Sequence, residues 1–237
     1  MPAFFVAAVG TGVGKTFFTS MCCKQLLKKK IKASAIKPVM SGYTEDKNDH
    51  ENDIFTLMKA QNMPINEQNV NIVSLYRLQN PISPDIAARK EGVNIDYDKL
   101  YKFCADKIVQ STDKYLLIEG VGGIMVPLSE SKTTLDLIVD LKIPVILITG
   151  TYLGCLNHTL TTIEVLNGRS IEIQAIVVNE SKEALTNINE IVCSLMNFTD
   201  IPINQLPRLT NIESDWHKIP DLTNIIIEND NEERKAS

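Results

Sequence analysis

Short apolar runs alternate with longer amphipathic segments along most of the chain. The apolar runs have strand-like length and cover residues 4–9, 34–37, 115–119, 144–149 and 173–179. The longer segments that we predict to be helical cover residues 17–30, 53–61, 97–112, 158–167 and 182–196. This alternation predicts an α/β fold, with a doubly wound, mostly parallel sheet and helices on both faces.

Polar groups and glycines gather where the predicted strands end. In a parallel sheet these ends meet at one edge, which is where ligands bind. The residues collected there are Val9 with the loop after it, Lys37, Ser41, Glu119 with the glycines after it, Thr149, Gly150 and Asn179. The sequence therefore predicts one ligand site along this edge.

Residues 10–16, Gly-Thr-Gly-Val-Gly-Lys-Thr, lie between the first predicted strand and the first predicted helix. A loop of this kind points backbone N–H groups at phosphate oxygens, with the lysine near the outer phosphates and the threonine hydroxyl on Mg²⁺. The strict pattern has a glycine where this chain has Val9. The strand, the flanking glycines and the helix favour a P-loop NTPase fold over a structural turn.

Length and composition indicate one domain. The chain has 237 residues, 44% of them apolar, which is enough for a full core. We expect a single domain over residues 1–227 and a polar, disordered tail over 228–237. The formal net charge of −5 argues against a nucleic-acid partner, since phosphate-backbone binding needs a basic face.

The cysteines and the apolar runs bear on the compartment. The five cysteines are scattered, and none lies at metal-ligand spacing from another, so we expect reduced core residues in the cytoplasm. No apolar run approaches the length of a membrane span, and no apolar leader precedes the first strand. We expect neither a membrane segment nor a targeting signal.

Several side chains at the predicted edge have more than one interpretation. Lys37 ends a buried strand, where a lysine must be paired or face an anion. With the phosphate loop expected on the neighbouring strand, we interpret Lys37 as a second phosphate-binding lysine; the alternative is a surface lysine. Glu119 fits a Mg²⁺ ligand or a solvated turn residue. Thr11 fits either a ligand contact or a tolerated polar residue.

A second metal carboxylate is expected among Asp49, Glu51 and Asp53. Asp53 is favoured because it stands where a helix begins, although a simple N-cap explains it as well. His50, His158 and His217 lie in three different segments and indicate no histidine metal site.

Five segments together resemble the dethiobiotin synthetases, in content and in order, over about residues 4–210. They are 13–16 (Val-Gly-Lys-Thr), 37–42 (Lys-Pro-Val-Met-Ser-Gly), 81–84 (Pro-Ile-Ser-Pro), 119–128 (Glu-Gly-Val-Gly-Gly through Pro-Leu) and 153–158 (Leu-Gly-Cys-Leu-Asn-His). The second and fifth are the specific ones. The resemblance implies an ATP- and Mg²⁺-dependent ligase of biotin biosynthesis, which carboxylates 7,8-diaminopelargonate with CO₂ and closes the ureido ring, yielding dethiobiotin, ADP and phosphate.

The resemblance also implies a role for each site residue. The catalytic residues would be Lys37, Lys15 and Thr11, and the Mg²⁺ ligands Thr16, Asp53 and Glu119. ATP would contact Gly12, Val13, Gly14, Lys15, Thr16, Phe17, Asp53, Glu119, Gly120, Val121, Gly122, Asn179 and Pro207. The diamine would contact Thr11, Lys37, Ser41, Pro81, Gly154, Cys155, Leu156 and Asn157. The last four would serve the partner subunit of a homodimer.

The chain departs from the family pattern inside the loop. Ala8 stands where the family's loop opens with glycine, and Gly10 and Gly12 stand where relatives more often carry acidic residues. One alternative is a nucleotide-switch ATPase of the partition and division-site type, but its signature lysine would fall at Gly10, and the tail lacks an amphipathic membrane helix. Another alternative is a degenerate ligase that only binds nucleotide.

Overall fold

The computed structural model describes residues 2–47, 49, 52–209 and 218–227. A six-stranded sheet of order β2-β5-β1-β6-β7-β8 forms its centre, and every strand pair in it is parallel. The strands are β1 (Ala3–Ala8), β2 (Ala33–Ile36), β5 (Tyr115–Glu119), β6 (Val145–Gly150), β7 (Ile173–Asn179) and β8 (Ile203–Leu206). Strands β2 and β5 lie on one side of β1, and strands β6, β7 and β8 follow on its other side. The sheet is therefore wound in both directions from β1, and the doubly wound prediction is confirmed.

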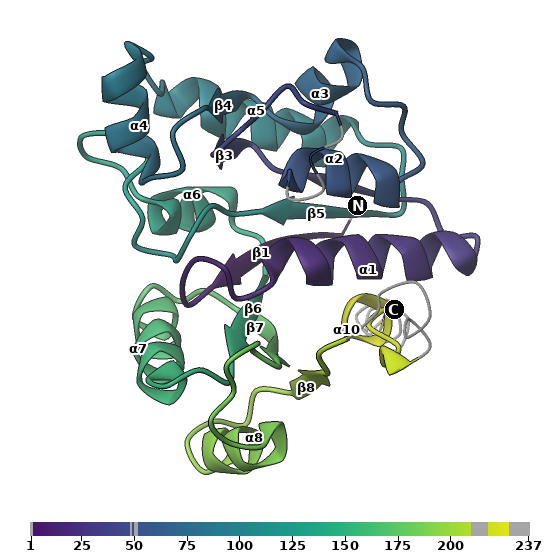
Figure 1. The fold of residues 1–237 in the computed structure, drawn as a ribbon, viewed down its shortest axis with the longest axis vertical. Coiled ribbons are helices and arrows are strands. Elements are labelled where there is room, and N and C mark those ends of the chain that lie inside the picture. Colours follow the sequence, from purple (N-terminus) through teal and green to yellow (C-terminus); the bar gives the residue numbers. More distant parts are fainter. Residues whose placement is uncertain (1, 48, 50–51, 210–217, 228–237) are drawn as a thin grey trace.

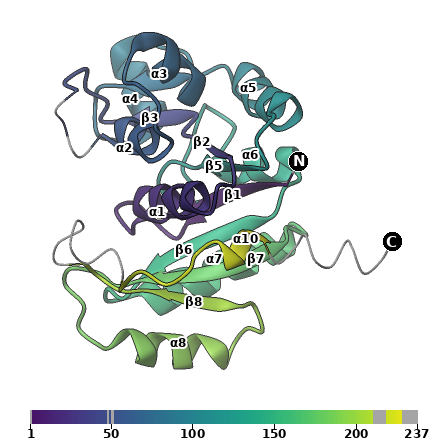
Figure 2. The ribbon, with the colours of Figure 1, turned by 90° about the vertical axis from the view of Figure 1, so that its right-hand side faces the viewer.

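Helices cover both faces of this sheet (Figure 1, Figure 2). They are α1 (Lys15–Lys28), α2 (Asp53–Ala60), α3 (Glu67–Val73), α4 (Pro84–Glu91), α5 (Tyr97–Gln110), α6 (Thr134–Leu141), α7 (Cys155–Gly168), α8 (Ile188–Met196) and α10 (Asn224–Ile227). Successive residues of β1 point to opposite faces: Phe5 packs in one core with α5 to α8, and Phe4 in another with α1, α2 and α10. Burying each of these rings contributes about 2 kcal/mol.

A second, two-stranded parallel sheet extends one end of the molecule. It consists of β3 (Val39–Ser41) and β4 (Tyr76–Leu78) and lies with α3 and α4 at the end opposite β8 and α8 (Figure 1, Figure 2). Pro38 separates β2 from β3, and Lys37 donates its backbone N–H to the Val73 carbonyl. The chain therefore leaves the main sheet at Lys37, and the segment after it becomes a wall above the sheet edge.

The predicted strands agree with the structure to within about one residue, and the helices predicted over 53–61 and 97–112 begin where α2 and α5 begin, whereas the other three predicted helices start elsewhere. Helix α1 begins at Lys15, directly after Gly14, and α7 begins at Cys155, directly after Gly154; both glycines have positive φ. The prediction of a helix over 182–196 is wrong at its start. Asn187 and Glu190 form a capping box that begins α8 at Ile188, and turns and bends occupy most of 182–186.

One expected neighbour is wrong. The strand of the phosphate loop, β1, does not pair with β2, because β5 lies between them. Lys37 at the end of β2 therefore lies beside Glu119 at the end of β5. Strands β3, β4 and β8 and helices α3, α4, α6 and α10 were not predicted, since each is short or lies in a segment with mixed polarity.

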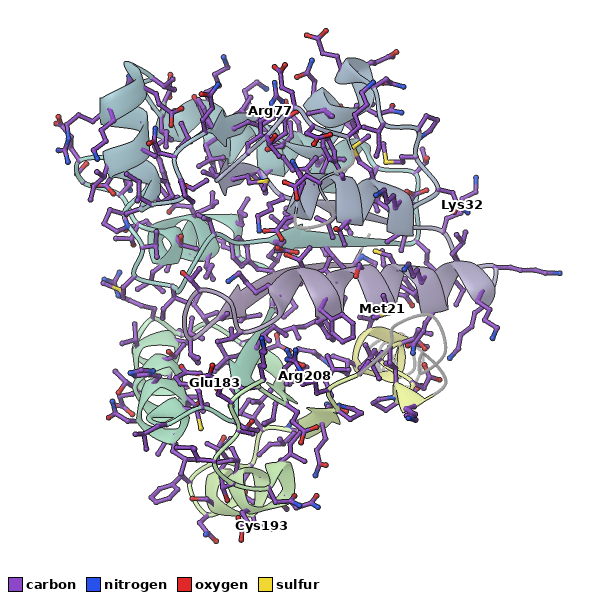
Figure 3. All side chains as sticks on the ribbon, in the orientation of Figure 1. Met21, Lys32, Arg77, Glu183, Cys193 and Arg208 are labelled. Carbon is purple, nitrogen blue, oxygen red and sulfur yellow. The ribbon has the colours of Figure 1, made fainter. Side chains whose placement is uncertain are left out.

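Four of the cysteines are buried and free, as expected, but Cys193 is exposed on the outer side of α8 (Figure 3). In the described part of the chain, no helix is both long and apolar enough to cross a membrane. The expected tail, Glu51, His50 and His217 lie outside the described residues. The single-domain boundary at residue 227 stays a prediction.

Candidate active site

A cavity of about 780 Å³ opens at the carboxyl ends of the central strands. The phosphate loop, the β3 end, α2 and two loops after β4 and β5 surround it. Its lining includes Thr11, Gly12, Gly14, Lys15, Thr16, Phe17, Lys37, Met40, Ser41, Gly42, Asp49, Asp53, Pro81, Ile82, Ser83, Pro84, Val121, Gly122 and Val126. This volume is typical of a small-molecule site.

The loop between β1 and α1 has the backbone of a phosphate cradle. Gly12 and Gly14 have φ of 73° and 99°, values that side chains with a Cβ rarely adopt. Ala8 has no positive φ and packs its methyl group in the core, so nothing at that position requires the glycine of the family pattern. The loop thus retains its glycines where the backbone needs them, and it ends at the N-terminus of α1.

Lys15 is buried beneath this loop. Its ammonium donates to the Gly10 carbonyl at 3.1 Å and to the Gly122 carbonyl at 2.8 Å. Burial, and then the nearby Lys37 charge, lower the pKa of Lys15 to about 8. An anion entering the cavity would therefore meet a lysine whose charge is only partly compensated by its surroundings.

Glu119 links three elements just beneath the cavity; its side chain is fully buried and is not among the residues that line the cavity. Its Oε1 accepts hydrogen bonds from the Thr16 hydroxyl and from the Lys37 ammonium, both at 2.6 Å. Its Oε2 is buried and has no hydrogen-bond partner among the described residues. A buried carboxylate oxygen without a partner is costly, so this atom is suited to a ligand that brings a positive charge.

Lys37 lies between two carboxylates. Its side chain is 5% exposed and donates to Asp53 Oδ2 at 2.5 Å as well as to Glu119. Burial alone would lower the pKa of Lys37, but the Glu119 and Asp53 charges outweigh burial and raise it. Lys37 is therefore a permanent cation, and the interpretation as a surface lysine is wrong.

Thr16, Asp53 and Glu119, the side chains expected from the sequence to bind Mg²⁺, lie close together around Lys37, and their role as metal ligands stays a prediction. No group of three or more His, Cys, Asp or Glu side chains suited to a metal occurs among the described residues. Two carboxylates and a hydroxyl fit Mg²⁺, which keeps several waters and takes other oxygens from substrate phosphates. The unpartnered Glu119 oxygen is the feature that supports this fit. Asp49 lines the same cavity, so it remains a candidate beside Asp53.

The opposite wall holds Ser41 and the loop at Pro81–Pro84. The Ser41 hydroxyl oxygen is buried and has no hydrogen-bond partner within the described part of the chain. Glu91, at the end of α4, accepts from the backbone N–H groups of Gln79 and Asn80 and from the Asn80 side chain. The Asn80 carbonyl in turn accepts from Gly42 N–H. Glu91 therefore positions this wall, although no motif in the sequence pointed to it.

The remaining predicted nucleotide contacts lie around the loop. Asn179, at the end of β7, donates from its side-chain amide to the Val13 carbonyl at 2.9 Å. Pro207 follows β8, and the backbone N–H of Arg208, labelled in Figure 3, donates to the Glu180 carboxylate. Neither Asn179 nor Pro207 lines the cavity. Gly120 packs against the Phe5 ring, where a Cβ would come within 2.9 Å, so its role is close packing.

Four predicted substrate contacts lie outside the cavity of their own chain. Gly154, Cys155, Leu156 and Asn157 begin α7, and none of them lines the cavity. Cys155 is buried in the core, whereas Gly154, Asn157 and the preceding Leu153 are exposed, Leu153 at 85%. His158 shares a hydrogen bond with the Tyr152 hydroxyl rather than with any metal-type cluster.

Solved structures of two ATPase families share this fold. The chain superposes on a plasmid partition protein from Borrelia burgdorferi bound to AMPPNP with a TM-score of 0.57 and 13% identity, covering 96% of this chain and 98% of that one. It superposes on the MinD cell division protein from Aquifex aeolicus with a TM-score of 0.55 and 14% identity, covering 95% and 94%. At such identities the likeness shows the P-loop NTPase fold alone.

Sequence comparison is more specific. A family model described as an AAA domain matches residues 2–214. The chain is 35% identical to the ATP-dependent dethiobiotin synthetase BioD of Acidiphilium cryptum, over 92% of this chain and 96% of the relative. It is 34% identical to the protein of the same name from Thermodesulfovibrio yellowstonii, over 90% and 91%. This chain belongs to the dethiobiotin synthetase family.

Proposed function

We propose that this protein is an ATP-dependent dethiobiotin synthetase. One amine of 7,8-diaminopelargonate adds to CO₂ and loses a proton, which gives a carbamate. A carbamate oxygen attacks the γ-phosphorus of ATP, ADP leaves, and a mixed carbamic-phosphoric anhydride forms. The second amine then attacks the carbamoyl carbon and loses a proton, phosphate leaves, and the ureido ring of dethiobiotin is closed.

The observation that carries this proposal is the cation pair at the cavity floor. A phosphate loop alone would serve any nucleoside triphosphatase, but this site adds a second buried lysine, Lys37, at the end of a different strand. Lys15 lines the cavity at the end of the phosphate loop, and Lys37 lines it from the segment between β2 and β3. Two neighbouring cations, close enough for the Lys37 charge to lower the pKa of Lys15, suit a reaction in which an anionic carbamate attacks an anionic phosphate.

The two lysines would act on charge that builds up during phosphoryl transfer. Phosphoryl transition states spread negative charge over the equatorial oxygens, so fixed cations stabilise them with little reorganisation. Removing one such contact costs on the order of 3 kcal/mol. Thr11, exposed at the cavity mouth, and the unpartnered Ser41 hydroxyl would hold the carbamate and the diamine.

Thr16, Asp53 and Glu119 would hold Mg²⁺ together with the ATP phosphates. Such an ion neutralises phosphate charge and orients the triphosphate. For both carboxylates to be used in this way, the Lys37 ammonium would have to leave them. We infer that Lys37 exchanges carboxylate partners for substrate anions when the site is filled.

We also propose a homodimer in which the start of α7 serves the partner's cavity. The exposed Leu153, Gly154 and Asn157 at a helix N-terminus support this proposal, because backbone N–H groups there suit a substrate carboxylate. A location in the cytoplasm is part of the same proposal, and the five free cysteines support it.

The test is phosphate release from ATP with Mg²⁺ and bicarbonate, measured with and without 7,8-diaminopelargonate. We expect release that depends on the diamine. Steady release without diamine would favour a nucleotide switch instead, whereas ATP binding with no release in either condition would indicate a degenerate ligase.

A further inference from the structure

Asn179 contacts the phosphate loop from a distant strand. It is the last residue of β7, where it pairs in register with Gly150 of β6 and Leu206 of β8. Its side-chain Nδ2 donates to the Val13 carbonyl at 2.9 Å. The rigid central sheet thus reaches the loop through one amide.

The same amide lies directly against Gly14. A Cβ at Gly14 would come within 2.0 Å of Asn179 Nδ2 and 3.0 Å of its Cγ, so no side chain fits between them. Gly14 is also the N-cap residue of α1, so no N-cap side chain accepts a hydrogen bond from the first turn of this helix. The turn that carries the loop into α1 is therefore held in part by packing and hydrogen bonding from β7.

Chemistry fixes the orientation of this amide. The Val13 carbonyl is an acceptor only, so the NH₂ group must face it. The amide group then retains a second N–H and a carbonyl oxygen. A donor beside an acceptor is the pattern that a nucleobase edge requires, so contact with the loop does not compete with contact with a base.

We propose that Asn179 is a positioning residue for the phosphate loop, in addition to any contact that it makes with the base. Through Val13 it fixes the backbone that presents N–H groups to the phosphates. The inference rests on the proposed nucleotide-binding function, but not on the identity of the second substrate.

Inorganic tripolyphosphate separates the two roles because it has phosphates and no base. Wild type, Asn179→Ala and Asn179→Leu would be compared for tripolyphosphate and ATP affinity by calorimetry, and for amide hydrogen exchange of residues 10–16 without ligand. Asn197→Ala, at an exposed position after α8, is the matched control. Circular dichroism establishes that each variant folds, and the leucine variant keeps the side-chain volume if alanine does not fold.

We expect both substitutions to weaken tripolyphosphate and ATP binding, each by about fivefold or more, the effect of one lost hydrogen bond. Loop amides should exchange faster, and the control should match wild type. The proposal would be overturned if both variants bind ATP more weakly but keep the tripolyphosphate affinity and the loop hydrogen exchange of wild type. Asn179 would then be a base contact only. If wild type binds ATP but not tripolyphosphate, the amide hydrogen exchange of residues 10–16 is decisive. Faster exchange in both variants supports the proposal, and unchanged exchange overturns it. A wild type that binds neither would refute the nucleotide site itself, and this proposal with it.

Discussion

Single side chains at the cavity floor, together with Glu119 buried beneath it, form a network of ion pairs and hydrogen bonds. The ammonium of Lys37 lies between Asp53 and Glu119, and the Thr16 hydroxyl donates to the same Glu119 oxygen. A buried ion pair of this kind contributes little net stability, because desolvation offsets much of the attraction. We therefore interpret Lys37 as a group kept for catalysis, which also neutralises the carboxylates until substrates arrive.

Replacing Lys37 with methionine should separate these two roles. Lys37→Met keeps the buried stem but leaves two carboxylates uncompensated, so the protein without nucleotide should bind Mn²⁺ more tightly than wild type. Diamine-dependent turnover should fall, because roughly 3 kcal/mol of transition-state stabilisation is lost. Mn²⁺ binding is read by electron paramagnetic resonance, and Lys29→Met, which alters a half-exposed lysine paired with Asp221, is the control. Unchanged Mn²⁺ affinity and unchanged turnover would remove Lys37 from the mechanism.

ATP affinity should depend on pH through Lys15. Its pKa in the free protein is lowered to about 8, and bound phosphates favour its charged form and raise that pKa. The affinity for ATP is thus at its full value below pH 8. Above pH 8 it falls by up to about tenfold per pH unit, because Lys15 must take up a proton when ATP binds. Calorimetry from pH 7 to 9.5 measures this slope. Lys15→Arg, which stays charged, should bind with a flat profile. A flat profile in wild type would contradict the lowered pKa.

The chemically distinctive residues could be predicted from sequence, and their neighbours could not. Lys15, Thr16 and Lys37 stand at strand ends or in the loop, where the parallel-sheet rule alone brings them to one edge. The pairing of Lys37 with Glu119 depends on strand order, which a single sequence does not encode locally. The role of Glu91 depends on tertiary contacts to backbone N–H groups, which leave no motif.

At the scale of elements, short structures decide the shape of the substrate wall. The central strands are visible from sequence because each is a nearly continuous apolar run, as expected for strands of a parallel sheet that is covered on both faces. Strands β3 and β4 have three residues each, and α4 is recognisable only by Pro84 at its start. These elements depend on packing rather than on local propensity, so the wall could not be predicted although its Pro81–Pro84 segment could be singled out.

Glu91→Ala should loosen this wall. Without the carboxylate, the N–H groups of Gln79 and Asn80 lose their acceptor, and the loop at Pro81–Pro84 loses its anchor. We expect the KM for the diamine to rise severalfold, about the effect of one lost hydrogen bond, while the KM for ATP changes little. Lys90→Ala, an exposed neighbour on α4, is the control in the same steady-state assay. An equal rise in both KM values would point to general destabilisation instead.

At the scale of the whole molecule, the proposed homodimer shares each site between two copies of the chain. Lys37 lies in the chain's own cavity, whereas Asn157 lies outside it on α7. Lys37→Ala and Asn157→Ala should each be weakly active alone. After unfolding and refolding together, mixed dimers should regain one intact site each, giving roughly a quarter of wild-type activity for a statistical mixture. If mixed dimers are shown to form but activity does not recover, Asn157 acts in the cavity of its own chain or lies outside the site.

The proposed reaction builds a ureido ring from a diamine, CO₂ and ATP. The most direct measurement is mass spectrometry of the product formed from 7,8-diaminopelargonate, ATP, Mg²⁺ and ¹³C-bicarbonate. We expect dethiobiotin that carries the label in its ureido carbonyl, formed in step with phosphate and absent without ATP. Phosphate release with no labelled dethiobiotin, from a protein that binds ATP normally, would contradict it.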